Sequence, residues 1–193
     1  TSPRMEALAQ KLSPILTKHE NDIILNPKLF ARVKAVHDHH RELTPEEQML
    51  LDKEYDAFVR SGALLDEAGK EKLRKLTEEA SMLTLQFSQN LLKENKAFIL
   101  HLTDKAQLSG LPDTAIDAAA QAAKERNLDG WVITLDYPSY SPFLIYSDHR
   151  DLRKQLYMAR NTECIKDNKE NNLGICSRLI NLRREMAQLL GYD

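Results

Sequence analysis

The chain is poor in the residues that build tight turns and cross-links. Only 6 Gly and 7 Pro occur among 193 residues, which argues against disorder and against a turn-rich all-β fold. The two cysteines, Cys164 and Cys176, do not form a CxxC pair, so their number and spacing exclude a zinc knuckle. Free buried thiols in a reducing compartment are the expected state.

Long apolar runs and clusters of one charge are also missing. No segment approaches the roughly 20 apolar residues that cross a bilayer, and no apolar stretch of a signal peptide follows the first four residues. The 27 Lys and Arg residues are interleaved with 29 Asp and Glu, without the basic stripe that binds nucleic acid. We therefore expect no membrane and no nucleic-acid partner, and a cytoplasmic location with the periplasm left open.

Helix-forming residues are abundant, and several helix starts can be recognised. Asn26 followed by Pro27 is typical of an N-cap, and residues 44–47 (TPEE) form a capping box. Asp66 caps a helix predicted to run from residue 67 to about residue 96, which would be roughly 45 Å long at 1.5 Å per residue. Its apolar residues recur every three or four positions, as in a seam between packed helices: Leu73, Leu76, Ala80, Leu83, Phe87 and Leu91.

Two short segments favour strands. Residues 98–102 and 131–135 are rich in β-branched, aromatic and alternating apolar residues, and an Ala-rich helix from residue 113 to about residue 126 separates them. The predicted fold is mainly α, a helical bundle with one long helix and a small two-stranded β element. We expect one helical region over residues 1–193, with a weak internal boundary near residue 97.

The sequence contains no recognisable catalytic or metal-binding motif. A zinc peptidase helix needs two His four residues apart with a Glu beside the first, but Ile23 stands four residues after the pair His19-Glu20. Residues 37–40 (HDHH) place two imidazoles on one helix face without an identifiable third ligand, so we interpret them as a polar helix end. Gly-x-Ser-x-Gly and phosphate-binding glycine loops are absent. We assign no catalytic residue and no metal ligand.

An aromatic segment is the most interesting candidate site. Tyr137, Tyr140 and Phe143 lie in a segment that Pro138 and Pro142 restrict, and we predict a rigid loop there. Rigid aromatic side chains suit peptide binding because they offer contact area at a small entropy cost. The alternative is a loop that only packs on its own sheet.

Several stretches, in this order and spacing, resemble the thimet oligopeptidase and peptidyl-dipeptidase family of zinc peptidases. The likeness runs from about Lys18 to Tyr192 and rests on residues 24–30 (ILNPKLF), 83–90 (LTLQFSQN), 130–132 (GWV), 138–143 (PSYSPF), 182–183 (LR) and 189–192 (LLGY). The family is two-lobed, with zinc held by an HExxH helix and a later Glu on the floor of a deep channel. Those residues lie beyond the part that this sequence resembles.

The resemblance implies that this sequence is an internal, non-catalytic fragment of the helical lobe, inactive alone and without its own zinc. Its partners would be short peptides and the missing catalytic lobe of the same chain. Tyr137, Tyr140 and Phe143 are then candidates for lining the substrate channel. The alternative function is a self-standing helical interaction domain that docks partners on its long helix.

Overall fold

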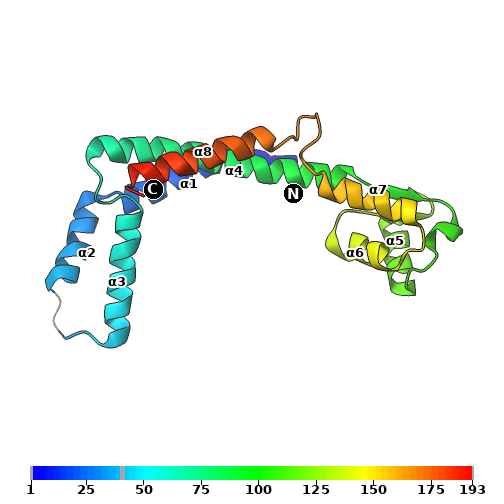
Figure 1. The fold of residues 1–193 in the computed structure, drawn as a ribbon, viewed down its shortest axis with the longest axis horizontal. Coiled ribbons are helices and arrows are strands. Elements are labelled where there is room, and N and C mark those ends of the chain that lie inside the picture. Colours follow the sequence, from blue (N-terminus) through cyan, green and yellow to red (C-terminus); the bar gives the residue numbers. More distant parts are fainter. Residues whose placement is uncertain (1, 40–41, 193) are drawn as a thin grey trace. The chain divides into compact units, whose positions relative to one another are not determined.

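The computed structural model describes residues 2–39 and 42–192, and it confirms the mainly α fold (Figure 1). The α-helices are α1 (Pro3–Ile24), α2 (Pro27–His39), α3 (Pro45–Arg60), α4 (Glu67–Ala97), α5 (Asp113–Lys124), α6 (Tyr137–Tyr146), α7 (Arg150–Asn161) and α8 (Leu173–Leu189). The other elements are the strands β1 (Leu100–Leu102) and β2 (Trp131–Ile133) and the 3₁₀ helix η1 (Lys105–Leu108). None of the described helices is long and apolar enough to cross a membrane.

The chain divides into two compact units. The first comprises the residues up to Gln86 together with those from Gly174 on, and the second comprises residues 87–173. Helix α4 contributes its N-terminal part to the first unit and its C-terminal part to the second.

The helix starts follow the local sequence signals. Thr44 Oγ1 accepts a hydrogen bond from the Glu47 N–H at 3.3 Å, and the Glu47 carboxylate accepts one from the Thr44 N–H at 2.9 Å. Asn26 Oδ1 accepts two N–H groups at the start of α2, and Asp66 Oδ1 accepts the Gly69 N–H at 2.7 Å at the start of α4. These side chains satisfy N–H groups that the first turn leaves without a helical partner. The predicted capping box and caps are confirmed.

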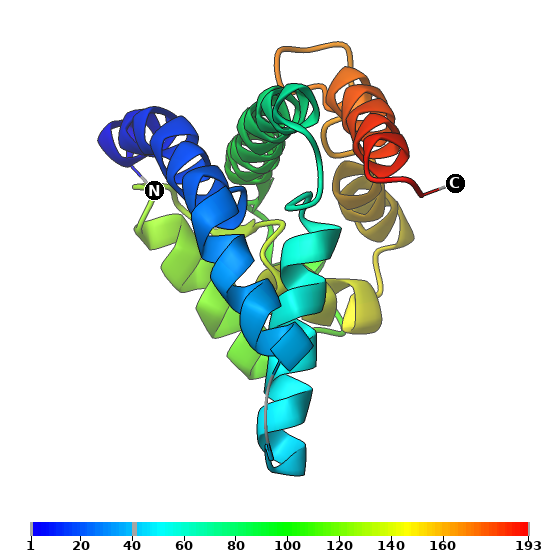
Figure 2. The same ribbon diagram turned by 90° about the vertical axis from the view of Figure 1, so that its left-hand side faces the viewer.

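In the first unit, α4 lies between α1 and α8 (Figure 2). The predicted α4 seam buries Leu73 and Leu76, whereas Ala80 and Leu83 are half-buried. Polar contacts join α4 to its neighbours: Asn21 Nδ2 donates to Thr77 Oγ1 at 2.9 Å, and Arg178 forms a two-pronged ion pair with Glu79 at 2.6 and 2.7 Å. Paired guanidinium–carboxylate bonds fix orientation more strictly than a single contact does.

Helices α2 and α3 form a hairpin with its own small core. Phe30, Phe58 and Ala63 are buried there, and the rings of Phe30 and Phe58 lie 5.9 Å apart. Gly62 follows the C-cap Ser61 of α3 at φ +94°, a left-handed conformation that favours glycine after a helix.

In the second unit, β1 and β2 pair antiparallel, with His101 opposite Val132, and α5 packs on the sheet. Gly130 precedes β2 at φ +84°, and a Cβ there would lie 2.3 Å from the Leu102 carbonyl oxygen. Only glycine fits this close approach between the strands. The core around the sheet consists of Leu100, Leu102, Leu108, Leu111, Ala119, Ile133, Leu135, Phe143 and Leu156.

The predicted aromatic loop is wrong as a secondary-structure assignment, because residues 137–146 form helix α6. Pro138 falls in the first helical turn, where the missing N–H has no partner to lose. Pro142 lies inside the helix and removes one helical hydrogen bond. The helix tolerates this loss because burial of the Phe143 ring stabilises it. The two strands are also shorter than predicted, and η1 was not predicted.

Candidate functional site

The aromatic residues of α6 have three different environments. Tyr137 is 70% exposed, Tyr140 is half-buried and Phe143 is fully buried in the core of the second unit. The rings of Tyr137 and Tyr140 meet edge to face, with centroids 5.6 Å apart. Tyr137 and Tyr140 can therefore contact a ligand directly, whereas Phe143 holds α6 on the core from within.

Tyr140 is fixed by a chain of polar contacts from α7 and α4. The Arg160 guanidinium lies 5.5 Å from the centre of the Tyr140 ring, within the range of a cation–π contact, and it forms an ion pair with Glu163. Glu163 accepts a further hydrogen bond from Asn95 Nδ2 at 3.2 Å. Burial lowers the pKa of Arg160, but contacts with Tyr140 and Glu163 outweigh this effect and raise it. The ring is thus held before any ligand arrives.

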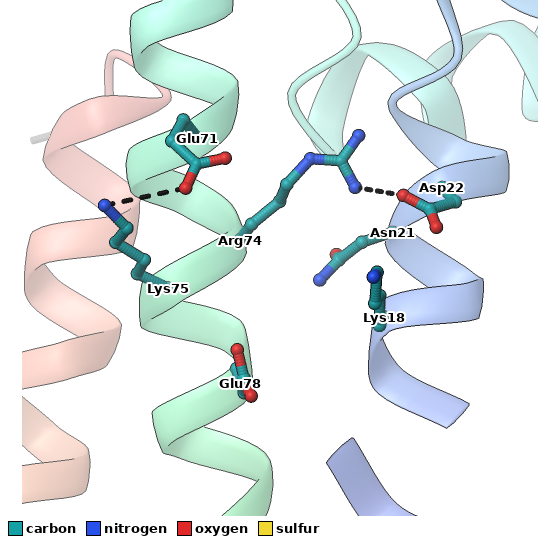
Figure 3. A pocket seen from close by; sticks show the side chains of 7 residues that line it. All are labelled: Lys18, Asn21, Asp22, Glu71, Arg74, Lys75 and Glu78. Atoms are coloured by element: carbon teal, nitrogen blue, oxygen red, sulfur yellow. Dashed lines mark hydrogen bonds and ion pairs between the residues drawn. The ribbon is translucent and has the colours of Figure 1, made fainter. Parts of the chain in front are cut away.

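A second candidate is a polar groove between α1 and α4 in the first unit (Figure 3). It has a volume of about 560 Å³ and is lined by Lys18, Asn21, Asp22, Glu71, Arg74, Lys75 and Glu78. These residues recur every three or four positions on each helix, so each helix turns one polar face toward the groove.

The charges in this groove balance one another. Arg74 reaches from α4 to α1, where its Nη1 lies 2.7 Å from Asp22 Oδ1, whereas Lys75 pairs with Glu71 within α4 at 3.5 Å (Figure 3). Three cations, three carboxylates and one amide line the groove. Such a lining can hold an extended polar chain by hydrogen bonds, but it contains no nucleophile paired with a general base.

A buried carboxylate anchors the segment between α7 and α8 within the second unit. Glu94 is 7% exposed, and it accepts hydrogen bonds from the Cys164 N–H and, at 2.5 Å, from Lys166 Nζ. Asn90 Nδ2 donates to Asn172 Oδ1 at 2.9 Å, so the same face of α4 also holds the end of this segment. This network could not be predicted from the sequence, because nothing local marks Glu94 as different from the exposed acids of α4.

The described residues do not build a metal centre. Within residues 2–39 and 42–192, no three His, Cys, Asp or Glu side chains are gathered closely enough to hold an ion. His19 is exposed, and His37 stacks on Tyr55 with ring centroids 4.0 Å apart, while His40 lies outside the described residues. The donor set therefore does not fit the zinc that the family resemblance implies.

Both cysteines are free thiols, but they differ in burial. Cys164 is buried and adopts φ +58°, whereas Cys176 is half-buried in α8. Burial and the neighbouring Glu94 carboxylate raise the pKa of the Cys164 thiol to about 11. A thiol with so high a pKa is a poor nucleophile at neutral pH, so Cys164 is a structural residue.

The chain is similar in sequence to several known peptidases. It is 37% identical over its whole length to dipeptidyl carboxypeptidase of Escherichia coli, across 29% of that protein. It is 28% identical over its whole length to oligopeptidase A of the same organism, again across 29%. Saccharolysin of Saccharomyces cerevisiae is 30% identical over 90% of the chain and 23% of its own length. The chain thus spans less than a third of these relatives, and no family model matches it.

Proposed function

Because this chain belongs to the family of dipeptidyl carboxypeptidase and oligopeptidase A, we propose that it forms a non-catalytic helical wall of a peptidase channel. The parent enzyme would hydrolyse short peptides. One observation carries the proposal: the chain matches peptidases along its whole length, yet covers only 29% of two of them. The described residues gather no metal-ligand group, which supports a wall rather than a reaction centre.

The zinc of the proposed parent enzyme would be held outside this sequence. The family resemblance implies an HExxH helix and a later Glu as zinc ligands, and the HExxH motif does not occur among the 193 residues. When bound, zinc supplies a polarised water for attack on a peptide carbonyl. The residues of this chain would instead shape the channel, admit extended peptides and exclude folded proteins.

Within that wall, Tyr137 and Tyr140 are the proposed contacts with the peptide. Tyr137 offers an exposed ring, and Tyr140 is held in place through Arg160. Phe143 would contribute by fixing α6 on the core, since its side chain is fully buried. A fixed ring loses little freedom when a peptide binds, which favours affinity.

Two experiments test this proposal. The purified 193-residue chain should neither cleave a fluorogenic peptide nor retain stoichiometric zinc after dialysis, as measured by fluorescence and metal analysis. In the intact parent enzyme, Tyr140→Ala should change the KM or kcat/KM for short peptides. The matched control is Tyr146→Ala, which removes a 53% exposed ring at the end of α6. Chelator-sensitive cleavage by the chain alone, or identical kinetics for Tyr140→Ala and the parent, would contradict the proposal.

A self-standing interaction domain is the second candidate, and exposed apolar residues favour it. Val36, Met49 and Leu50 are 54%, 56% and 61% exposed on the α2–α3 hairpin. Contiguous exposed apolar patches are typical of surfaces that meet another protein, and Val36 and Leu50 line one shared apolar hollow of this hairpin. An HExxH motif followed by a downstream Glu in the sequence beyond residue 193 would decide for the peptidase.

A further inference from the structure

A hollow on one face of α7, within the second unit, collects positive charge. It has a volume of about 360 Å³ and is lined by Leu144, Arg150, Arg153, Lys154 and Tyr157. The α7 residues stand at relative positions 1, 4, 5 and 8 of the helix, so they share one face. The lining therefore combines three cations with one aromatic and one aliphatic side chain.

Among residues 2–39 and 42–192, none of these three cations forms an ion pair with an acidic side chain. Asp151, one residue after Arg150 and three before Lys154, is exposed and is not part of the lining. Arg160, near the C-terminal end of α7, pairs instead with Glu163, which follows the helix. The lining thus contributes three positively charged side chains and no carboxylate.

One of the three cations is held in place. Arg153 is half-buried, and its Nη1 donates a hydrogen bond to the Ser147 carbonyl oxygen. This acceptor is neutral, so it orients the guanidinium without cancelling its charge. The remaining N–H groups of Arg153 keep the fork geometry that matches an oxyanion.

We propose that this hollow binds a multiply charged oxyanion of the phosphate class. A single carboxylate would neutralise one of the three cations, whereas a phosphate dianion offers several acceptor oxygens to all three. The side chains of Leu144 and Tyr157 would contact the organic group that carries the phosphate. The inference does not depend on the proposed peptidase function, because it rests on the side chains of the second unit alone.

The test is an NMR titration of the ¹⁵N-labelled 193-residue chain at pH 7.5 and constant ionic strength. Inorganic phosphate is the probe, and acetate is the singly charged comparison. Phosphate should give saturable shifts centred on α7, and acetate should not. Arg150→Gln and Lys154→Gln should each weaken phosphate binding by about threefold or more. Lys124→Gln removes an exposed cation at the end of α5, outside the hollow, and should leave the affinity unchanged.

Each contrary outcome overturns the proposal. Equal shifts with acetate would mean that the cations respond only to general screening. Unchanged affinity in both α7 variants would place any phosphate contact elsewhere. Because neither substituted side chain forms part of the core and Arg153 is left in place, retention of the folded spectrum in both variants provides the check on folding.

Discussion

Replacing Glu94 by alanine should destabilise the second unit more than any exposed acidic replacement in it. Glu94 is almost fully buried in α4, and its carboxylate binds the buried Cys164 N–H and the half-exposed Lys166 ammonium. Alanine removes both acceptor oxygens at once. The segment between α7 and α8 would then lose its main anchor on α4.

The magnitude follows from the two contacts. A buried N–H left without an acceptor costs about 1–3 kcal/mol. The Lys166 side chain is 47% exposed, so its ion pair is discounted for screening and adds less than about 1 kcal/mol. We therefore expect Glu94→Ala to lower the free energy of unfolding by about 1–4 kcal/mol.

The assay is urea denaturation followed by tryptophan fluorescence. Trp131 is the single tryptophan and lies in β2, so its signal reports on the unit that contains Glu94. The matched control is Glu125→Ala, which removes an exposed carboxylate that accepts a 3.0 Å hydrogen bond from Gln121. This substitution should change stability by less than about 0.5 kcal/mol. A Glu94→Ala loss no larger than that of the control would refute the anchoring role.

Two further predictions concern titration. Burial raises the pKa of Glu94, but hydrogen bonds from Lys166 and Cys164 outweigh it and lower the pKa below its ordinary range. Its stabilising contribution is therefore present above the unfolded-state pKa of about 4.3 and is lost as the pH falls through the lower folded-state pKa. Glu94→Gln should accordingly flatten the acid limb of the stability curve; an unchanged acid limb would contradict this sign. Iodoacetamide at pH 8 should alkylate Cys176 and spare Cys164, whose thiol pKa is raised to about 11, until denaturant is added. Mass spectrometry showing equal rates for both thiols in the folded chain would contradict the burial argument.

Local sequence signals predicted the parts of the fold that depend on neighbouring residues. The capping box at Thr44, the cap at Asp66 and the long helix from residue 67 are confirmed because their hydrogen bonds form within one turn. The family resemblance is likewise confirmed by relatives that match the whole chain. The loop predicted at residues 137–143 is wrong because two prolines favour a loop locally, whereas burial of Phe143 stabilises helix α6 there.

The sequence by itself determined the helical class, the helix starts and the lack of an HExxH motif, since these depend on composition and on residues a few positions apart. Only the tertiary structure decided which charged side chains differ from the rest. Glu94 has the same local pattern as its exposed neighbours, and burial against Cys164 distinguishes it. The groove between Asp22 and Arg74 likewise depends on two helices packing across more than fifty residues of chain. Burial and long-range contacts arise when distant segments meet, and no local pattern specifies which segments will do so.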